Sequence, residues 1–90
     1  MILKKYIVNL KNECDNIIEV EYNLVKTFIG KKEIYGFIIN TKNHTTKDSY
    51  EEKYTDFTDN LQKAESIFLK LIENKVLSSN LINVLDDMTN

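Results

Sequence analysis

The 90-residue chain contains no proline, two glycines, one cysteine and one histidine. The single cysteine, Cys14, leaves no internal disulfide to form and is typical of a reducing compartment, which predicts a cytoplasmic protein. Cys14 and His44 cannot supply a structural zinc site without several carboxylates. Gly30 and Gly36 match no phosphate-binding spacing. The sequence therefore predicts neither a metal site nor a cofactor.

Long apolar runs are also missing, although 42% of the residues are hydrophobic. No run approaches the roughly 18 residues that a membrane-spanning helix needs, so we expect no membrane segment. Residues 1–13 place lysines inside an alternating apolar pattern and do not resemble a secretory signal peptide. The hydrophobic content is sufficient for a core, and the length fits one domain over residues 1–90.

Charge is distributed unevenly along the chain, although the formal net charge is only −2. Residues 1–47 hold eight lysines and five acids, whereas residues 48–90 hold four lysines and nine acids. A nucleic-acid-binding protein of this size usually carries a clear basic excess on the element that contacts the phosphates. The charge balance therefore disfavours nucleic-acid binding, although a local basic patch would escape a whole-chain count.

The strongest pattern is an alternation of apolar and polar residues from Ile18 to Leu24, which is typical of a strand with one buried face. Gly30 and the two lysines after it form the expected turn. The return strand is apolar on both faces. Gly36 leaves a gap in one of its rows, which indicates either a bulge or room for a helix side chain. We therefore expect a long β-hairpin in the middle of the chain.

Helical periodicity begins after this sheet region. From Leu61 to Ile72, apolar residues recur at spacings of three and four, which predicts a helix with one apolar face. Thr58 or Asp59 is the expected N-cap, and a short second helix follows a linker. Residues 49–57 are ambiguous, because they fit a charged edge strand and also align on a helix; we favour the strand.

An amphipathic meander needs a cover on its apolar face, and two amphipathic helices need an apolar floor. The predicted fold is therefore α+β, an antiparallel meander covered on one face by two C-terminal helices. Its three to four strands are expected at about residues 3–11, 17–29, 33–41 and, as the ambiguous fourth, 49–57, and its helices at about 59–74 and 79–88.

Two segments resemble a family of short uncharacterised proteins from low-GC Gram-positive, spore-forming anaerobes. They are EYNLVKTFIGKKEIYGFII in the hairpin and ENKVLSSNLINVLDDM near the C-terminus. The family often has a proline and a histidine in the linker, where this chain has Ser79 and Asn80. The resemblance implies paired strands followed by two helices, and it implies no activity. The C-terminal pattern is matched at Asn74, Val76, Leu81, Val84, Leu85 and Asp87.

The sequence contains no recognisable catalytic constellation. His44 lies in the loop segment KNHTTK without a carboxylate or nucleophile beside it, so we expect a solvated histidine. Acids next to Cys14 disfavour its thiolate, so this residue is a poor nucleophile. We therefore predict no catalytic residues and no enzyme activity.

An exposed sheet face or edge strand can recruit a protein partner or a second copy of the same chain. We therefore predict a non-enzymatic cytoplasmic protein-interaction or regulatory module, which binds a protein partner or forms a homodimer. The expected contact residues are Tyr35, Phe37, Ile39, Tyr50 and Tyr54.

Two alternatives remain open. A small nucleic-acid-binding accessory protein would contact phosphates through Lys4, Lys5, Lys26, Lys31, Lys32, Lys42 and Lys47, and its sheet aromatics would stack on bases. A phage- or plasmid-borne inhibitor of a host nucleic-acid enzyme would mimic phosphates with acids of the C-terminal half, such as Glu65, Glu73, Asp86 and Asp87.

Overall fold

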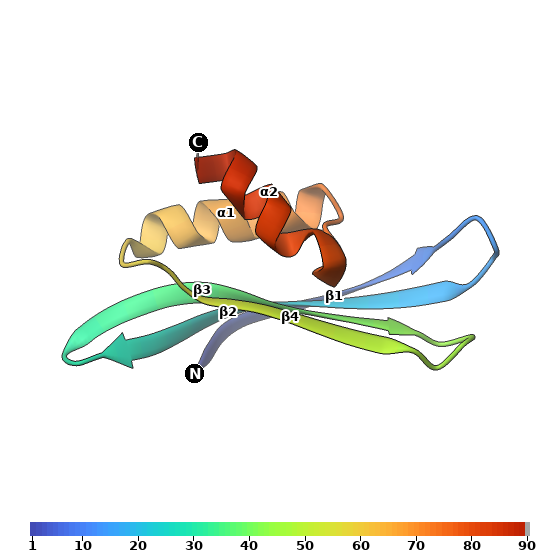
Figure 1. The fold of residues 1–90 in the computed structure, drawn as a ribbon, viewed down its shortest axis with the longest axis horizontal. Coiled ribbons are helices and arrows are strands. Elements are labelled where there is room, and N and C mark those ends of the chain that lie inside the picture. The colour runs from blue at the N-terminus through green and yellow to red at the C-terminus, as the bar shows by residue number, and fades with distance from the viewer. Residues whose placement is uncertain (90) are drawn as a thin grey trace.

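A computed structural model of the chain describes residues 1–89, without the side chains of Ser79, Met88 and Thr89. These residues form a sheet with two α-helices packed on one side of it (Figure 1). The elements are β1 (Ile2–Lys11), β2 (Ile17–Ile29), β3 (Lys32–Asn43), β4 (Ser49–Thr58), α1 (Leu61–Glu73), a 3₁₀ turn η1 (Ser78–Asn80) and α2 (Leu81–Thr89).

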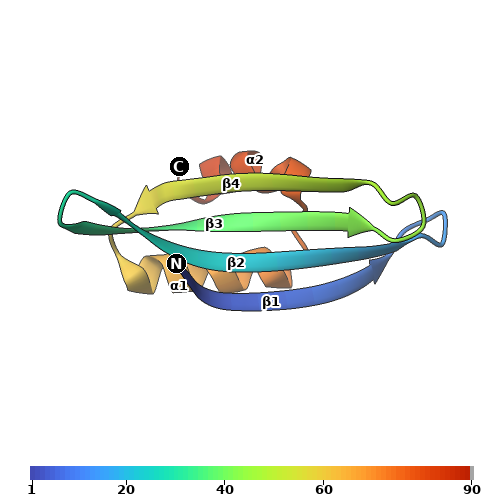
Figure 2. The ribbon, with the colours of Figure 1, turned by 90° about the horizontal axis from the view of Figure 1, so that it is seen from below.

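The sheet is an antiparallel meander in which the four strands lie in chain order, β1-β2-β3-β4. Tyr22 pairs with Tyr6 on one side and with Ile39 on the other, and Ile39 pairs with Glu52 of β4. Seen through the sheet, α1 lies behind β1 and β2, while α2 lies behind β4 (Figure 2). The predicted α+β fold and its element order are confirmed, and residues 49–57 form a strand.

The core lies between the sheet and the helices. Because side chains alternate along a strand, the even residues of β2 and the odd residues of β3 point toward the helical layer. Tyr22 and Leu24 from β2 are fully buried there, together with Leu71 of α1 and Leu85 of α2. We call this side of the sheet the helix face and the other side the open face.

The start of α1 differs from the expectation. Asn60 is the N-cap, and its side-chain oxygen accepts a hydrogen bond of 3.1 Å from the Lys63 N–H. Thr58 instead completes β4, where it pairs with Tyr35. The carboxylate of Asp59 lies 2.9 Å from Lys32 Nζ, and this lysine lowers the pKa of Asp59. The predicted caps, Thr58 and Asp59, are therefore wrong because tertiary partners engage them.

Gly36 permits a close approach of two strands. Phe37 pairs with Tyr54 and Tyr35 pairs with Thr58, so that Gly36 faces the three β4 residues between them. A Cβ at position 36 would lie 2.2 Å from the Tyr54 carbonyl oxygen, so the backbone of β4 occupies the space that a side chain would need. The gap in the sequence pattern is therefore a bulge, one of the two predicted explanations.

Two core tyrosines have different polar surroundings. Tyr22 is 1% exposed, and its hydroxyl has no hydrogen-bond partner among the described residues. The hydroxyl of Tyr35 donates a 3.0 Å hydrogen bond to a carboxylate oxygen of Glu33. Burial raises the pKa of Tyr22, whereas the hydrogen bond to Glu33, with burial, raises the pKa of Tyr35. The fold therefore favours the neutral form of both phenols over the ionised form.

We expect Tyr22→Phe to raise the free energy of unfolding by about 1 kcal/mol at pH 7, because it removes a buried hydroxyl that lacks a partner. Tyr35→Phe is the matched control and should lower this free energy, since it removes a hydrogen bond. Urea denaturation followed by circular dichroism measures both. A loss of stability in Tyr22→Phe would show that its hydroxyl is bonded in the folded state.

The same pair gives a prediction for alkaline pH. A tyrosine whose folded-state pKa is raised above the unfolded value of about 10 contributes its full stabilisation of the folded state below that pH. This contribution is lost as the pH rises through the folded-state pKa. We therefore expect stability to fall above about pH 10, and to fall less steeply in Tyr22→Phe. If the stability of Tyr22→Phe falls with pH as steeply as that of the wild type, the raised pKa of Tyr22 does not cause the fall.

Candidate functional site

The structure divides the five predicted contact residues between the core and the surface. Tyr35, Phe37 and Ile39 are 6%, 0% and 1% exposed, because they lie on the helix face beneath the helical layer. Tyr50 and Tyr54 belong to the edge strand β4 and are 67% and 37% exposed. The five residues therefore do not form one accessible surface, and only the two tyrosines of β4 remain available to a partner.

The helical layer is shorter than the sheet that it covers. α1 and β2 each contain 13 residues, but a helix of this length spans about 20 Å and a strand about 43 Å. The strands therefore extend past the helices, as Figure 1 shows for the β1–β2 and β3–β4 turns. At that end Ile18 and Tyr50 lie on the helix face beside the linker residues Leu77 and Ser78.

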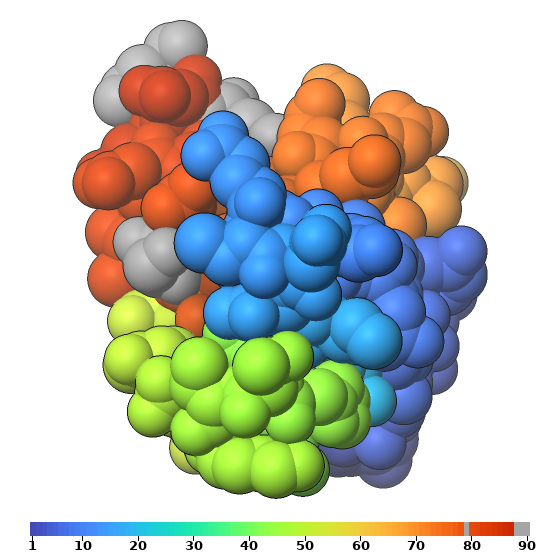
Figure 3. Space-filling model, turned by 90° about the vertical axis from the view of Figure 1, so that its right-hand side faces the viewer, coloured from blue at the N-terminus to red at the C-terminus, as the bar shows by residue number. Residues whose placement is uncertain are grey.

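A cleft of about 310 Å³ occupies this end of the molecule. Figure 3 views this end, with the blue β1–β2 turn and the green β3–β4 turn beside each other. The two turns are joined by a 2.9 Å hydrogen bond from the His44 N–H to the Ile17 carbonyl oxygen. We call this space the end cleft; its lining residues are Asn12, Ile18, Thr41, Tyr50, Leu77 and Ser78.

One wall of the end cleft is formed by the linker between α1 and η1, and backbone hydrogen bonds hold this linker in place. Lys75 has a φ of 53°, and its N–H bonds to the Ile72 carbonyl, while the Val76 N–H bonds to the Leu71 carbonyl. This pattern is a Schellman motif, which ends α1 and turns the chain back toward the sheet. The Ser78 N–H then donates a 3.2 Å hydrogen bond to the Thr41 hydroxyl and ties the linker to β3.

The opposite wall is held by the β1–β2 turn. The side-chain oxygen of Asn12 accepts hydrogen bonds of 2.9 Å from the N–H groups of Cys14 and Asn16. Asp15 takes a φ of 62° in this turn. A side chain that hydrogen-bonds the backbone of its own turn stabilises that turn. Both walls of the end cleft are therefore fixed by hydrogen bonds within the chain.

The end cleft is chemically apolar. The apolar groups that line it include Ile18, Leu77 and the ring of Tyr50, and its polar lining residues carry amide and hydroxyl groups. Among the residues whose side chains the structure describes, none that lines the end cleft carries a charge. A site of this kind suits an apolar group with a few hydrogen-bonding atoms and offers nothing to neutralise a phosphate or carboxylate.

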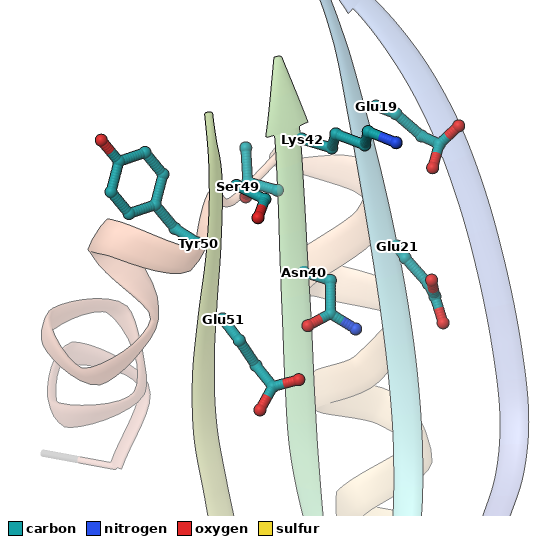
Figure 4. A pocket seen from close by; sticks show the side chains of 8 residues that line it. Glu19, Glu21, Asn40, Lys42, Ser49, Tyr50 and Glu51 are labelled. Carbon is teal, nitrogen blue, oxygen red and sulfur yellow. The ribbon is translucent and has the colours of Figure 1, made fainter. Parts of the chain in front are cut away.

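The open face has a second, polar depression of about 380 Å³. Figure 4 shows side chains from β2, β3 and β4 along it, with Tyr50 pointing away from the others. Glu19 lies 3.3 Å from His44 Nε2, and Glu21 lies 3.3 Å from Lys5 Nζ. The lining residues are Glu19, Glu21, Asn40, Thr41, Lys42, Ser49, Tyr50 and Glu51. Three carboxylates make this depression a poor site for phosphate.

The remaining chemistry-bearing side chains lie apart. Folding brings Glu19 to His44, a partner that is distant in sequence, but within residues 1–89 no hydroxyl or thiol is hydrogen-bonded to this imidazole. Cys14 is exposed in the β1–β2 turn. Among residues 1–89, no three His, Cys, Asp or Glu side chains are grouped closely enough to hold a metal ion. No helix formed by these residues is long and apolar enough to cross a bilayer.

Sequence reasoning missed Ile18 and Leu77 as site residues. Ile18 was expected on the buried face of its strand and Leu77 only as an anchor of the linker, and both are partly buried in the structure. The signal that was available is the difference in length between the predicted strands and the predicted helices. A helix rises less per residue than a strand, so the predicted helix of 16 residues is shorter than the predicted strand of 13 residues. It cannot cover the whole strand, and one end of the helix face is left uncovered by it.

A comparison with protein-family models matches residues 2–90 to a family of unknown function, DUF6514. The chain belongs to this family. Membership of DUF6514 agrees with the resemblance noted above at the level of an uncharacterised family, and the bacterial source of the resembling proteins stays a prediction. The comparisons with curated proteins and with solved structures returned no match. The function of this DUF6514 member must therefore be argued from its own geometry.

Proposed function

We propose that this DUF6514 protein is a non-enzymatic cytoplasmic interaction module, and that its end cleft accepts an apolar side chain of a protein partner. The observation that carries the proposal is Tyr50. This large aromatic side chain is 67% exposed at the rim of an apolar cleft whose walls are held by hydrogen bonds within the chain. Exposed aromatic residues beside apolar pockets are typical anchors of protein interfaces.

The distribution of ion pairs favours a protein partner over a nucleic acid. Lys4 lies 2.8 Å from Glu65, and Lys5 lies 3.3 Å from Glu21. Lys26 and Lys32 are paired with Glu33 and Asp59 in the same way. Four of the seven lysines that would contact phosphates therefore already face carboxylates, which reduces the positive potential available to a nucleic acid.

The test is capture of partners from a nuclease-treated lysate by the full chain, by Tyr50→Ala and by Phe28→Ala. Phe28 is the matched control, because this aromatic residue is 60% exposed on the helix face at the opposite end of β2. We expect one protein to be retained by the wild-type chain and by Phe28→Ala, and to be reduced at least about tenfold by Tyr50→Ala.

Equal retention by all three chains would show that Tyr50 and the end cleft are not the binding site. Retention of no protein would overturn the proposal of a stable protein partner. Circular dichroism of Tyr50→Ala is expected to match the wild type, since an exposed side chain contributes little to folding.

A further inference from the structure

The two edges of the sheet are unequal. Neighbouring chains pair with exposed edge strands unless charges, bulges or covering elements prevent it. β4 contains Glu51, Glu52 and Asp56, and its ladder is interrupted by the bulge opposite Gly36. β1 carries three lysines, but each of them faces a carboxylate of its own chain (Glu65, Glu21 and Asp15), and its pairing with β2 is regular from Lys4 to Lys11. The edge at β1 is therefore the one that remains suitable for a further strand.

The backbone groups that β1 offers can be assigned from the hydrogen-bond pattern. The His44 N–H bonds to the Ile17 carbonyl and the Asn12 N–H bonds to the Asn16 carbonyl. Hydrogen-bonded pairs alternate along an antiparallel ladder, so odd residues of β2 bond to β3 and even residues bond to β1. The N–H and C=O groups of Lys5, Ile7 and Asn9 consequently point away from the sheet.

Apolar side chains flank the same edge on both faces. Tyr6 on the helix face and Ile7 on the open face are each 51% exposed. Above the edge, Glu65 of α1 reaches Lys4 at 2.8 Å, which places this side of α1 over β1. Leu69 follows Glu65 by four residues, so it lies on the same side of the helix, and it is 58% exposed. The edge thus combines unpaired backbone with exposed apolar groups.

We propose that β1 pairs with β1 of a second copy of this chain, antiparallel and with Ile7 on the two-fold axis, so that two sheets become one. This proposal goes beyond the end cleft and does not depend on it. A two-fold interface is self-complementary and closes, whereas pairing of β1 with β4 of another copy would leave free edges and grow into a filament.

Charge selects the register of this pairing. Facing residues must lie on the same side of the sheet, because a slip by one residue exchanges the two faces. With Ile7 opposite its own copy, Lys5 faces Asn9 and Lys4 faces Leu10. The neighbouring register centred on Val8 would place Lys5 against Lys11, and like charges directly opposite are unfavourable. The register centred on Tyr6 would pair a shorter part of the regular strand.

The proposed dimer has a defined shape. The two-fold axis runs perpendicular to the sheet, so the helices of both copies lie on the same side of the continuous sheet. The side of α1 that carries Leu69 then faces the second copy. The two end clefts lie at opposite ends of the dimer on that same side, and the polar depressions lie on the other side.

Sedimentation velocity over a concentration series tests the interface, with Ile7→Lys and Ile29→Lys as matched variants. Ile29 is the control, because it is an isoleucine of similar exposure, 56%, on the open face but in β2 at the hairpin tip. We expect a monomer–dimer equilibrium in the wild type. Ile7→Lys should weaken it at least about tenfold, because it places two lysines on the axis. Ile29→Lys should leave it unchanged.

Disulfide trapping tests the register in a Cys14→Ser background. Ile7→Cys places the two Cα atoms about 5.5 Å apart, within the range of a disulfide. Asn9→Cys is the control, because its two copies would be separated by about 13 Å along the strands. We expect oxidation to give covalent dimers of Ile7→Cys and not of Asn9→Cys.

Three results would overturn the proposal: a wild-type chain that stays monomeric throughout, assemblies larger than a dimer, or a dimer that Ile7→Lys leaves intact. Equal trapping of both cysteine variants would overturn the register. None of these results bears on the end cleft, and loss of partner binding in Tyr50→Ala does not bear on β1.

Discussion

Gly36→Ala is expected to lower the free energy of unfolding by about 3 kcal/mol, the upper end of the usual range for overpacking. The added Cβ would meet the Tyr54 carbonyl oxygen at 2.2 Å and the Thr55 Cα at 2.4 Å. Both atoms belong to backbone, so no flexible side chain can move aside. β4 would have to separate from β3 at the bulge, and a domain of this size has a total stability of only about 5–15 kcal/mol.

Gly30→Ala provides the matched control for this glycine. Gly30 lies in the β2–β3 turn with a φ of 64°, and nothing lies within 4 Å of the position that a Cβ would occupy. Its replacement costs only the backbone strain of a left-handed residue, about 1–2 kcal/mol. Urea denaturation of both variants measures their free energies of unfolding. If Gly36→Ala is the more stable of the two, β4 does not pass over Gly36 as described.

Leu71→Ala is expected to lower the free energy of unfolding by about 2–5 kcal/mol, because it leaves a cavity at the centre of the core. Leu71 is 0% exposed and packs in the cluster that joins α1 to the helix face of the sheet. Its carbonyl also accepts the Val76 hydrogen bond that ends α1, and this bond is kept in the variant. The loss is therefore due to the side chain alone.

Leu69→Ala is the matched control, because it removes the same atoms from a residue that is two positions away on the same helix and 58% exposed. We expect it to change stability by less than about 0.5 kcal/mol. Thermal or urea unfolding should be measured in dilute solution, so that any association of the chain does not contribute. Equal effects of the two substitutions would contradict the orientation of α1 on the sheet.

Much of this fold was predictable because local patterns and tertiary structure agree. The alternation from Ile18 to Leu24 specifies a strand with one buried face, and Gly30 specifies the turn that follows. The spacing of apolar residues from Leu61 to Ile72 specifies α1. Gly36 was recognised as an irregularity, although its partner in β4 was not identifiable, because that contact joins segments distant in sequence.

The candidate site was less predictable. β3 is apolar on both faces, so its sequence does not say which face the helices cover. The row of Tyr35, Phe37 and Ile39 was expected to be exposed and is buried, since the helices lie on that face. The opposite row is shielded in part at the bulge, where Ile34 is only 8% exposed. Burial of a two-sided strand depends on where other elements pack, which is a property of the whole fold.

The sequence by itself determined the type and order of the elements, because side-chain period and turn residues act over a few neighbouring positions. Only the tertiary structure decided which face is covered, how far the helical layer reaches, and that Tyr50, Ile18 and Leu77 meet at one cleft. It also decided the N-cap of α1, where Lys32 engages Asp59 and leaves the cap to Asn60. Each of these outcomes depends on contacts between residues far apart in the chain, and local periodicity carries no information about them.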